Sequence, residues 1–301
     1  MAWRLRPRLT YAAYRAAAAA VRALPPGTAY RLGEAAAGLA WRIDGKRRQV
    51  VERNLARILG DGLMSGERDR LSRAVFASYG RYWVESFTIP TLTRKDLDAA
   101  VTVEGLDGLD AALAAGKGAI LAIPHLGGWD FGGAWLASTG RPTTVVVEAL
   151  EPPELLAWFT KMRAKSGLVV LAATKGVAPM LASALRKGEI VGLVSDRDLS
   201  GTGVPVEFFG EVTTLPAGAA MLSLRTDAPI FPAAIYDVAD GRHRVVIQPP
   251  LSQPGPGRLG QRVQELTVAL AAELESLIRR APEQWHVFQP NWPSDATPDR
   301  L

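Results

Sequence analysis

A histidine and an aspartate stand five residues apart where a buried strand is predicted to end. The apolar run 119–123 has the pattern of a strand buried on both faces. Pro124 ends this run because it lacks the N–H that strand pairing needs. His125 therefore emerges at the carboxyl end of the strand, which is where open α/β sheets bind ligands. A histidine in that place, oriented by an acid such as Asp130, can act as a general base on a hydroxyl group.

Two glycines follow this histidine and leave the backbone uncovered. Gly127 and Gly128 precede Trp129, where a helix is predicted to begin. Their N–H groups could bind the oxyanion of a tetrahedral intermediate. A plainer interpretation competes with this one, because 30 of the 301 residues are Asp or Glu. A histidine then has an acid five positions later with a chance of about one in ten, and Asp130 could simply stabilise the start of the helix.

A second group of charged residues follows the predicted strand 190–194. Asp196 and Asp198 flank Arg197 there, at the same edge of a parallel sheet as His125. Either acid could polarise the histidine, and the arginine could bind a phosphate. Alternatively, the three charges only tie a surface turn together, which stabilises a protein little when the ion pairs are exposed.

Three further residues are candidates for substrate binding. Arg163, in a predicted helix, could clamp an anion. Glu148 follows the predicted strand 144–147 at the same sheet edge, and Glu207 lies in the block Val204–Gly210. The chain has no G-x-S-x-G elbow, no G-x-G-x-x-G after the first strand and no phosphate-binding P-loop. Serine-hydrolase, dinucleotide and P-loop chemistry are therefore not expected.

The composition restricts the chemistry further. Of the 301 residues 48% are apolar and 22% charged, which fits one large α/β domain or two small ones. The absence of cysteine excludes disulfides, thiolate metal sites and a thioester intermediate on the enzyme. Three histidines, far apart in the sequence, do not have zinc-ligand spacing, so we expect neither a metal site nor a resident cofactor.

Short apolar runs alternate with helical stretches from residue 101 onward. The strands are expected at 101–103, 119–123, 144–147, 169–171, 190–194, 230–235 and 245–247. The helices are expected near 109–115, 130–138, 153–166, 176–186, 216–226 and 262–280. This alternation predicts an α/β fold with a mostly parallel central sheet flanked by helices. We assign the core to residues 96–301, in one continuous domain with the residues that precede it.

The first 95 residues are helical and basic. Helices are predicted at 8–24, 29–43 and 67–88, and the basic excess behind the net charge of +5 is concentrated in residues 1–73. Arginines beside Tyr and Trp on weakly polar helices are typical of elements that lie at a membrane interface. We therefore predict that residues 1–95 associate with an anionic membrane surface; alternatively, these helices only pack on the core. Neither a signal peptide nor a transmembrane segment is predicted, and the basic charge accompanies no recognised nucleic-acid motif.

Several ordered blocks resemble bacterial glycerolipid and lipid A acyltransferases. The segment His125–Asp130 resembles their H-x-x-x-x-D block, and Asp196–Gly210 resembles the acidic loop leading to V-x-V-x-F-F-G. The segments Leu215–Ala220 and Ala228–Pro232 follow in family order, and Pro282–His286 resembles the closing block. The resemblance spans about residues 101–292, and within the family the acidic loop and the composition look most like the phosphatidylinositol mannoside acyltransferases.

This resemblance implies transfer of an acyl group, commonly palmitoyl, from acyl-CoA to a mannose hydroxyl of a phosphatidylinositol mannoside. It also implies a location at the cytoplasmic face of the plasma membrane. His125 would be the base, and Asp130, Asp196 or Asp198 would orient it. Arg163 and Arg197 would contact a phosphate or the thioester oxygen. The alternatives are an acyltransferase for a lipid A-type glycolipid or lysophospholipid, a thioesterase, and a non-catalytic lipid-binding protein of the same fold.

Overall fold

A twisted sheet of seven strands lies at the centre of the computed structural model, which describes residues 7–295 except 61, 63, 149–150, 175 and 239–240. Its order within the described residues is β1-β9-β8-β2-β5-β3-β4, and all neighbours are parallel except β8 and β9. The strands are β1 (Val101–Glu104), β2 (Ala119–Ile123), β3 (Thr143–Val147), β4 (Val169–Ala172), β5 (Ile190–Val194), β8 (Ile230–Val238) and β9 (Arg242–Ile247).

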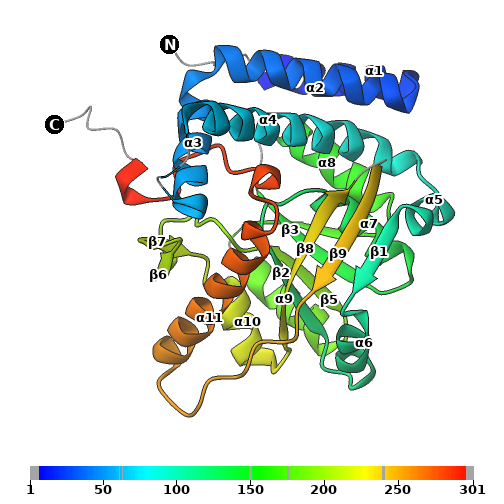
Figure 1. The fold of residues 1–301 in the computed structure, drawn as a ribbon. Helices are drawn as coiled ribbons and strands as arrows, with labels where there is room; N and C mark the ends of the chain where they lie inside the picture. The colour runs from blue at the N-terminus through cyan, green and yellow to red at the C-terminus, as the bar shows by residue number, and fades with distance from the viewer. Residues whose placement is uncertain are drawn as a thin grey trace.

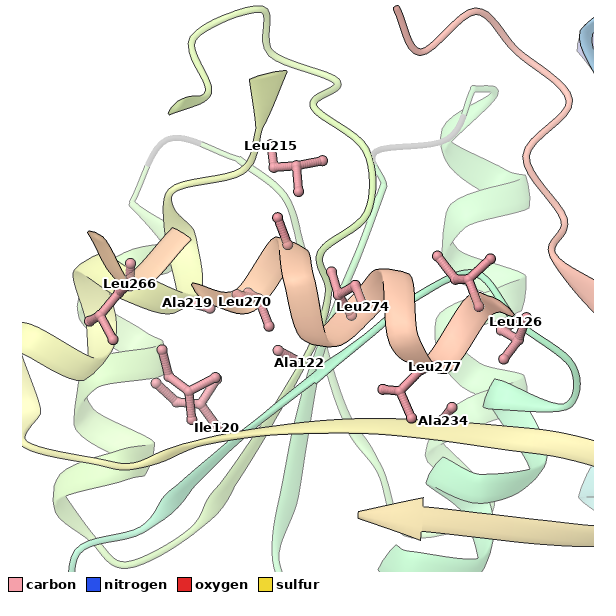
Figure 2. Packing of buried hydrophobic residues seen from close by; sticks show 14 of the residues in the cluster. Ile120, Ala122, Leu126, Leu215, Ala219, Ala234, Leu266, Leu270, Leu274 and Leu277 are labelled. Atoms are coloured by element: carbon pink, nitrogen blue, oxygen red, sulfur yellow. The ribbon is translucent and has the colours of Figure 1, made fainter. Parts of the chain in front are cut away.

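Helices cover both faces of this sheet (Figure 1). They are α6 (Leu106–Ala114), α7 (Trp129–Ser138), α8 (Pro153–Ala164), α9 (Val177–Arg186), α10 (Gly218–Thr226) and α11 (Leu259–Arg279). Strand β2 is buried on both sides, so its residues alternate between two cores. Ile120 and Ala122 face the core that α9, α10 and α11 complete, where leucines of α11 pack on small strand residues (Figure 2). Ala119 and Leu121 belong to the core on the α7 side.

Four N-terminal helices form a layer of their own. They are α1 (Pro7–Ala23), α2 (Pro26–Ile43), α3 (Gly45–Leu59) and α4 (Ser65–Thr88). The short helix α5 (Arg94–Ala99) packs on α7 instead. Both α1 and α2 pack on α4, which separates them from the sheet (Figure 1). The aromatic residues of α4 therefore pack in the interior, as Phe76 does against Phe288 with ring centroids 5.0 Å apart. Among the described helices, none has the length and apolar character that crossing a bilayer requires.

The predicted fold class is confirmed, and the predicted strands and helices agree with the observed elements to within a few residues at most ends. The sequence patterns did not predict α3, α5 and the antiparallel pair β6 (Val204–Phe208) and β7 (Glu211–Leu215). Nor did they indicate that β9 runs antiparallel to β8. In β6 only alternate residues are buried, and β6 packs on α11 rather than joining the main sheet. A boundary near residue 95 stays a prediction.

Candidate active site

The carboxyl ends of β2 and β5 bring His125 and Asp196 together. The two strands are parallel neighbours, so the residues that follow them meet at one edge of the sheet. Nδ1 of His125 lies 2.7 Å from Oδ1 of Asp196, and the backbone N–H of His125 donates to Oδ2 at 2.9 Å. Asp196 is fully buried, whereas the side chain of His125 is 26% exposed. Asp196 is thus placed to orient the ring, and the ring has access to a ligand.

The surroundings of Asp196 favour its charged form. Burial alone would raise the pKa of this carboxyl group, but the His125 side chain and backbone N–H and the indole N–H of Trp285 together hold it below its ordinary value. The indole nitrogen lies 2.7 Å from Oδ2. A carboxylate at Nδ1 favours the tautomer with its proton on Nδ1. Nε2 then carries the lone pair, which is the state that a general base needs.

His125 stands at the mouth of an apolar cavity of about 480 Å³. The cavity lies along the α7 side of the sheet and extends over the strand ends to the loop 197–200 and the start of α10. Leu121, Ile123 and His125 line it because alternate residues of a strand share a face. Its apolar lining further comprises Trp135, Leu136, Val145, Val147, Leu168, Val194, Ala233, Val245 and Ile247. Polar side chains line it near the strand ends, among them Tyr82, Asp130, Arg163 and Arg197. The arrangement can hold an apolar chain with its polar end beside an imidazole.

Asp130 does not contact the imidazole, so of the three acids predicted to orient His125 the structure places Asp196, and not Asp130, at the ring. Its two carboxylate oxygens accept hydrogen bonds from Nε and Nη2 of Arg163, both at 2.9 Å, and Oδ2 also accepts from Tyr82 at 3.0 Å. At the start of α7 it is Trp129 that packs edge-on against His125, with ring centroids 5.5 Å apart. Arg163 is likewise not the free anion-binding residue that was predicted, because its guanidinium group is already paired with Asp130.

Replacing Asp130 by asparagine should therefore lower stability more than catalysis. The change leaves the largely buried Arg163 without its counter-charge, which we expect to cost about 3 kcal/mol of unfolding free energy. Urea unfolding measures this cost, while kcat per folded protein should stay within about threefold of wild type. The matched control is Asp110→Asn, because Asp110 makes a similar two-bond pair with Arg141 but is 44% exposed; there we expect a loss below about 1 kcal/mol. Unchanged stability with a large loss of kcat in Asp130→Asn would contradict the structural role.

The predicted oxyanion site at the two glycines is not supported by their contacts. Gly127 has a positive φ of 55°, and its N–H donates to the carbonyl of Gln284 at 2.9 Å. A Cβ on Gly127 would lie 2.1 Å from the carbonyl oxygen of Ile235. A Cβ on Gly128 would lie 2.8 Å from Oε2 of Glu85. Neither glycine lines the cavity, so both serve the close approach of the turn to neighbouring residues.

The remaining predicted residues divide into two groups. Arg197 and Glu148 line the cavity, as does Asp198. However, Asp198 is not at the imidazole, because its carboxylate accepts hydrogen bonds from Ser200, Gly203 and Thr214 and so fixes its own loop. Glu207 is exposed on β6 and does not line the cavity, because its strand belongs to the separate two-stranded sheet.

A buried charged cluster beneath the His125 turn was missed from the sequence. Nε2 of His243 lies 2.7 Å from Oε1 of Glu85, and Nδ1 lies 3.4 Å from Oδ1 of Asp237. Burial lowers the pKa of His243, but the two carboxylates outweigh it and raise the pKa to about 9. One donor atom of each residue lies within 4.8 Å of the others, so this group could also hold a metal ion. Sequence spacing could not reveal it, because the three residues come from α4, β8 and β9.

His286 and Trp285, from the closing block Pro282–His286, also reach the site. The backbone N–H of His286 donates to the carbonyl of His125 at 2.8 Å, and its Nε2 lies 2.9 Å from Oγ of Ser78. Burial lowers the pKa of His286 to about 3, so the ring stays neutral and serves packing. The block thus supports the turn from behind, while the Trp285 indole holds Asp196.

Comparison with known proteins gives one consistent set of matches. A family model described as bacterial lipid A biosynthesis acyltransferase matches residues 3–294. A phosphatidylinositol mannoside acyltransferase of Mycolicibacterium smegmatis is 38% identical over 283 residues, which cover 93% of this chain and 90% of that protein. A protein of the same description from Mycobacterium tuberculosis is 37% identical over 293 residues, which cover 96% of this chain and 90% of that protein. A lipid A biosynthesis acyltransferase of Haemophilus influenzae is 30% identical over 226 residues, which cover 73% of this chain and 67% of that protein.

Proposed function

This chain belongs to the bacterial lipid A biosynthesis acyltransferase family. On that premise we propose that it transfers a long-chain acyl group, preferably palmitoyl, from acyl-CoA to a mannose hydroxyl of a phosphatidylinositol mannoside. The acceptor follows from the description of the mycobacterial relatives, which match over most of their length. The observation that carries the proposed chemistry is the Asp196–His125 pair at the mouth of an apolar cavity.

The proposed mechanism is direct transfer in a ternary complex. Nε2 of His125 takes the proton of the acceptor hydroxyl, and the oxygen attacks the thioester carbonyl carbon. The carbon–sulfur bond then breaks, and the imidazolium returns the proton to the CoA thiolate. Asp196 stabilises the imidazolium in between, as its buried carboxylate lies 2.7 Å from Nδ1. Without cysteine the chain offers no thiol for an acyl-enzyme, and Arg197 at the mouth is our candidate for contact with the thioester oxygen or a phosphate.

We place the enzyme on the cytoplasmic face of the plasma membrane as a peripheral protein. The outer face of α2 supports this placement, since Leu32, Leu39 and Ile43 are 54%, 55% and 70% exposed on one stripe. Arg31 and Arg42 are exposed beside them. Exposed apolar side chains flanked by arginines are typical of helices that lie in the interfacial plane of an anionic membrane.

The acyl-transfer proposal is tested with the purified chain, palmitoyl-CoA and phosphatidylinositol mannoside in detergent micelles. Mass spectrometry should detect a lipid heavier by one palmitoyl group, with one CoA released per product. A lipid A precursor serves as the alternative acceptor. Equal CoA release with and without acceptor would instead identify a thioesterase, and lipid binding without CoA release would identify a non-catalytic protein; either result would overturn the proposal.

The cavity also predicts a residue that governs acyl-chain length. Gly192 of β5 lines the cavity without a side chain, and a Cβ there would meet Cγ1 of Val145 at 3.2 Å. The side chain added in Gly192→Val should fill space that two methylenes of the acyl chain would occupy. Burial of each methylene contributes about 0.8 kcal/mol to binding. The kcat/KM for palmitoyl-CoA should then fall about tenfold, while that for decanoyl-CoA changes little. Gly260→Val is the control, because Gly260 has open space around it; equal losses for both donors in Gly192→Val would contradict this assignment.

A further inference from the structure

A second cavity, of about 500 Å³, opens between α1 and α8. It is distinct from the candidate active site, since Arg163 of α8 lines the active-site cavity, whereas Lys161 and Lys165 of the same helix line this one. We call it the basic groove. Its lining residues are Tyr11, Arg15, Arg22, Pro90, Glu154, Ala157, Trp158, Lys161, Met162 and Lys165.

The basic groove concentrates positive charge. Arg15 and Arg22 enter it from α1, Lys161 enters from α8 and Lys165 from the residue that caps α8, whereas Glu154 is the one acid among its described lining residues. Within the described residues none of the four cations lies within 4.0 Å of a carboxylate. Lys161 and Lys165 are four residues apart at the C-terminal end of α8, where like charges repel each other. A groove that gathers four unpaired cations against one acid is therefore suited to an anion.

The side chains that line the groove are anchored by hydrogen bonding and packing, so the groove has a defined shape. Nε of Arg22 donates to the carbonyl of Phe87 at 2.7 Å, which anchors the side chain and leaves both terminal nitrogens for a ligand. The ring of Trp158 packs on Phe159 with centroids 4.8 Å apart. Below it, α1, α4 and α8 share one apolar cluster with Ala18 and Met162 at its centre. The cations thus project from a packed surface.

The position of the groove indicates the source of the anion. Helix α1 lies beside α2, whose outer face carries the exposed leucines and isoleucine described above (Figure 1). Tyr11 and Trp158 line the groove, and these two residue types are enriched where protein meets the headgroup region of a bilayer. We propose that the basic groove binds the phosphate of an anionic phospholipid headgroup and so docks the enzyme on the membrane. This inference rests on the proposed membrane association and is independent of the acyl-transfer chemistry.

Calorimetric titration with a short-chain lipid tests this site apart from general surface charge. The probes are dihexanoyl phosphatidylglycerol and dihexanoyl phosphatidylcholine, both below their micelle-forming concentrations. The groove variant carries Arg15→Gln, Lys161→Gln and Lys165→Gln. The control variant carries Lys117→Gln, Arg186→Gln and Lys187→Gln, which remove the same charge from exposed residues outside the groove. Wild-type turnover in detergent is measured in parallel, because it tests the chemistry separately.

We expect wild type to bind the phosphatidylglycerol probe at least tenfold more tightly than the phosphatidylcholine probe. The groove variant should lose this preference and the control variant should keep it. An equal loss in both variants would overturn the inference, since net charge would then explain the binding. Tighter binding of CoA or inorganic phosphate than of the lipid probe, abolished in the groove variant, would overturn the lipid assignment. A wild-type protein that turns over but shows no headgroup preference would overturn this inference alone.

Discussion

Replacing His125 by alanine is expected to lower kcat about 10³-fold while the protein stays folded. A positioned general base contributes roughly 10²–10⁴ to a rate, and no other described residue pairs an imidazole with a buried carboxylate at the cavity mouth. The ring already lines an open cavity, so its loss enlarges that cavity rather than opening a void in the packed core. Asp196 keeps the indole N–H of Trp285 and the backbone N–H of residue 125. The melting temperature should therefore fall by no more than a few degrees.

The matched control for this variant is His286→Gln. His286 lies behind the same turn but is buried and neutral, so its replacement should lower stability and leave kcat per folded molecule nearly unchanged. Both variants are assayed for acylated lipid and unfolded in urea. Near-normal turnover of His125→Ala would refute the base assignment, whatever the control does.

Asp196→Asn should lower kcat by about two to three orders of magnitude. The carboxylate stabilises the imidazolium and fixes the proton on Nδ1, and an amide cannot supply the charge. An amide N–H facing Nδ1 would moreover favour the tautomer with its proton on Nε2, which cannot act as a base. The loss of the orienting aspartate in a Ser-His-Asp triad has an effect of this kind. Steady-state assays at saturating acyl-CoA measure the loss.

Asp198→Asn provides the comparison for that variant. Asp198 is two residues away and fixes a loop through Ser200, Gly203 and Thr214, so we expect a loss of stability and a small change in kcat. Replacing Asp196 by asparagine should lower kcat far more than the same replacement of Asp198 or Asp130. If Asp130→Asn gave the largest catalytic loss, the orienting role assigned to Asp196 would be wrong.

The parts of the fold that local patterns determine could be predicted from the sequence. Strand β2 is an uninterrupted apolar run ended by Pro124, so both its bounds and the position of His125 at its carboxyl end followed directly. The loop of Asp196 was placed at the same edge for the same reason. Which acid meets the ring was left open, because it depends on β2 and β5 being neighbours, and strand order is not encoded in any local pattern.

The missed features depend on contacts between distant segments. The sequence predicts uncovered backbone at Gly127 and Gly128, but the carbonyl of Gln284 and the side chain of Glu85 lie against them from elements more than forty residues away. The alternation of apolar and polar residues in β6 is typical of a half-buried strand and could have indicated the hairpin, but Pro205 weakens that pattern. Arg163 was predicted as an anion clamp on its type alone, and only the fold shows that Asp130 occupies it.

The protonation state of the His125 ring is the most direct test of the account. The chain contains only three histidines, so ¹⁵N NMR of the histidine-labelled protein resolves each ring, with His125→Ala used for assignment. We expect the uncharged His125 ring to carry its proton on Nδ1, hydrogen-bonded to Asp196, and to leave Nε2 bare. A proton on Nε2, or a His125 spectrum unchanged by Asp196→Asn, would contradict it.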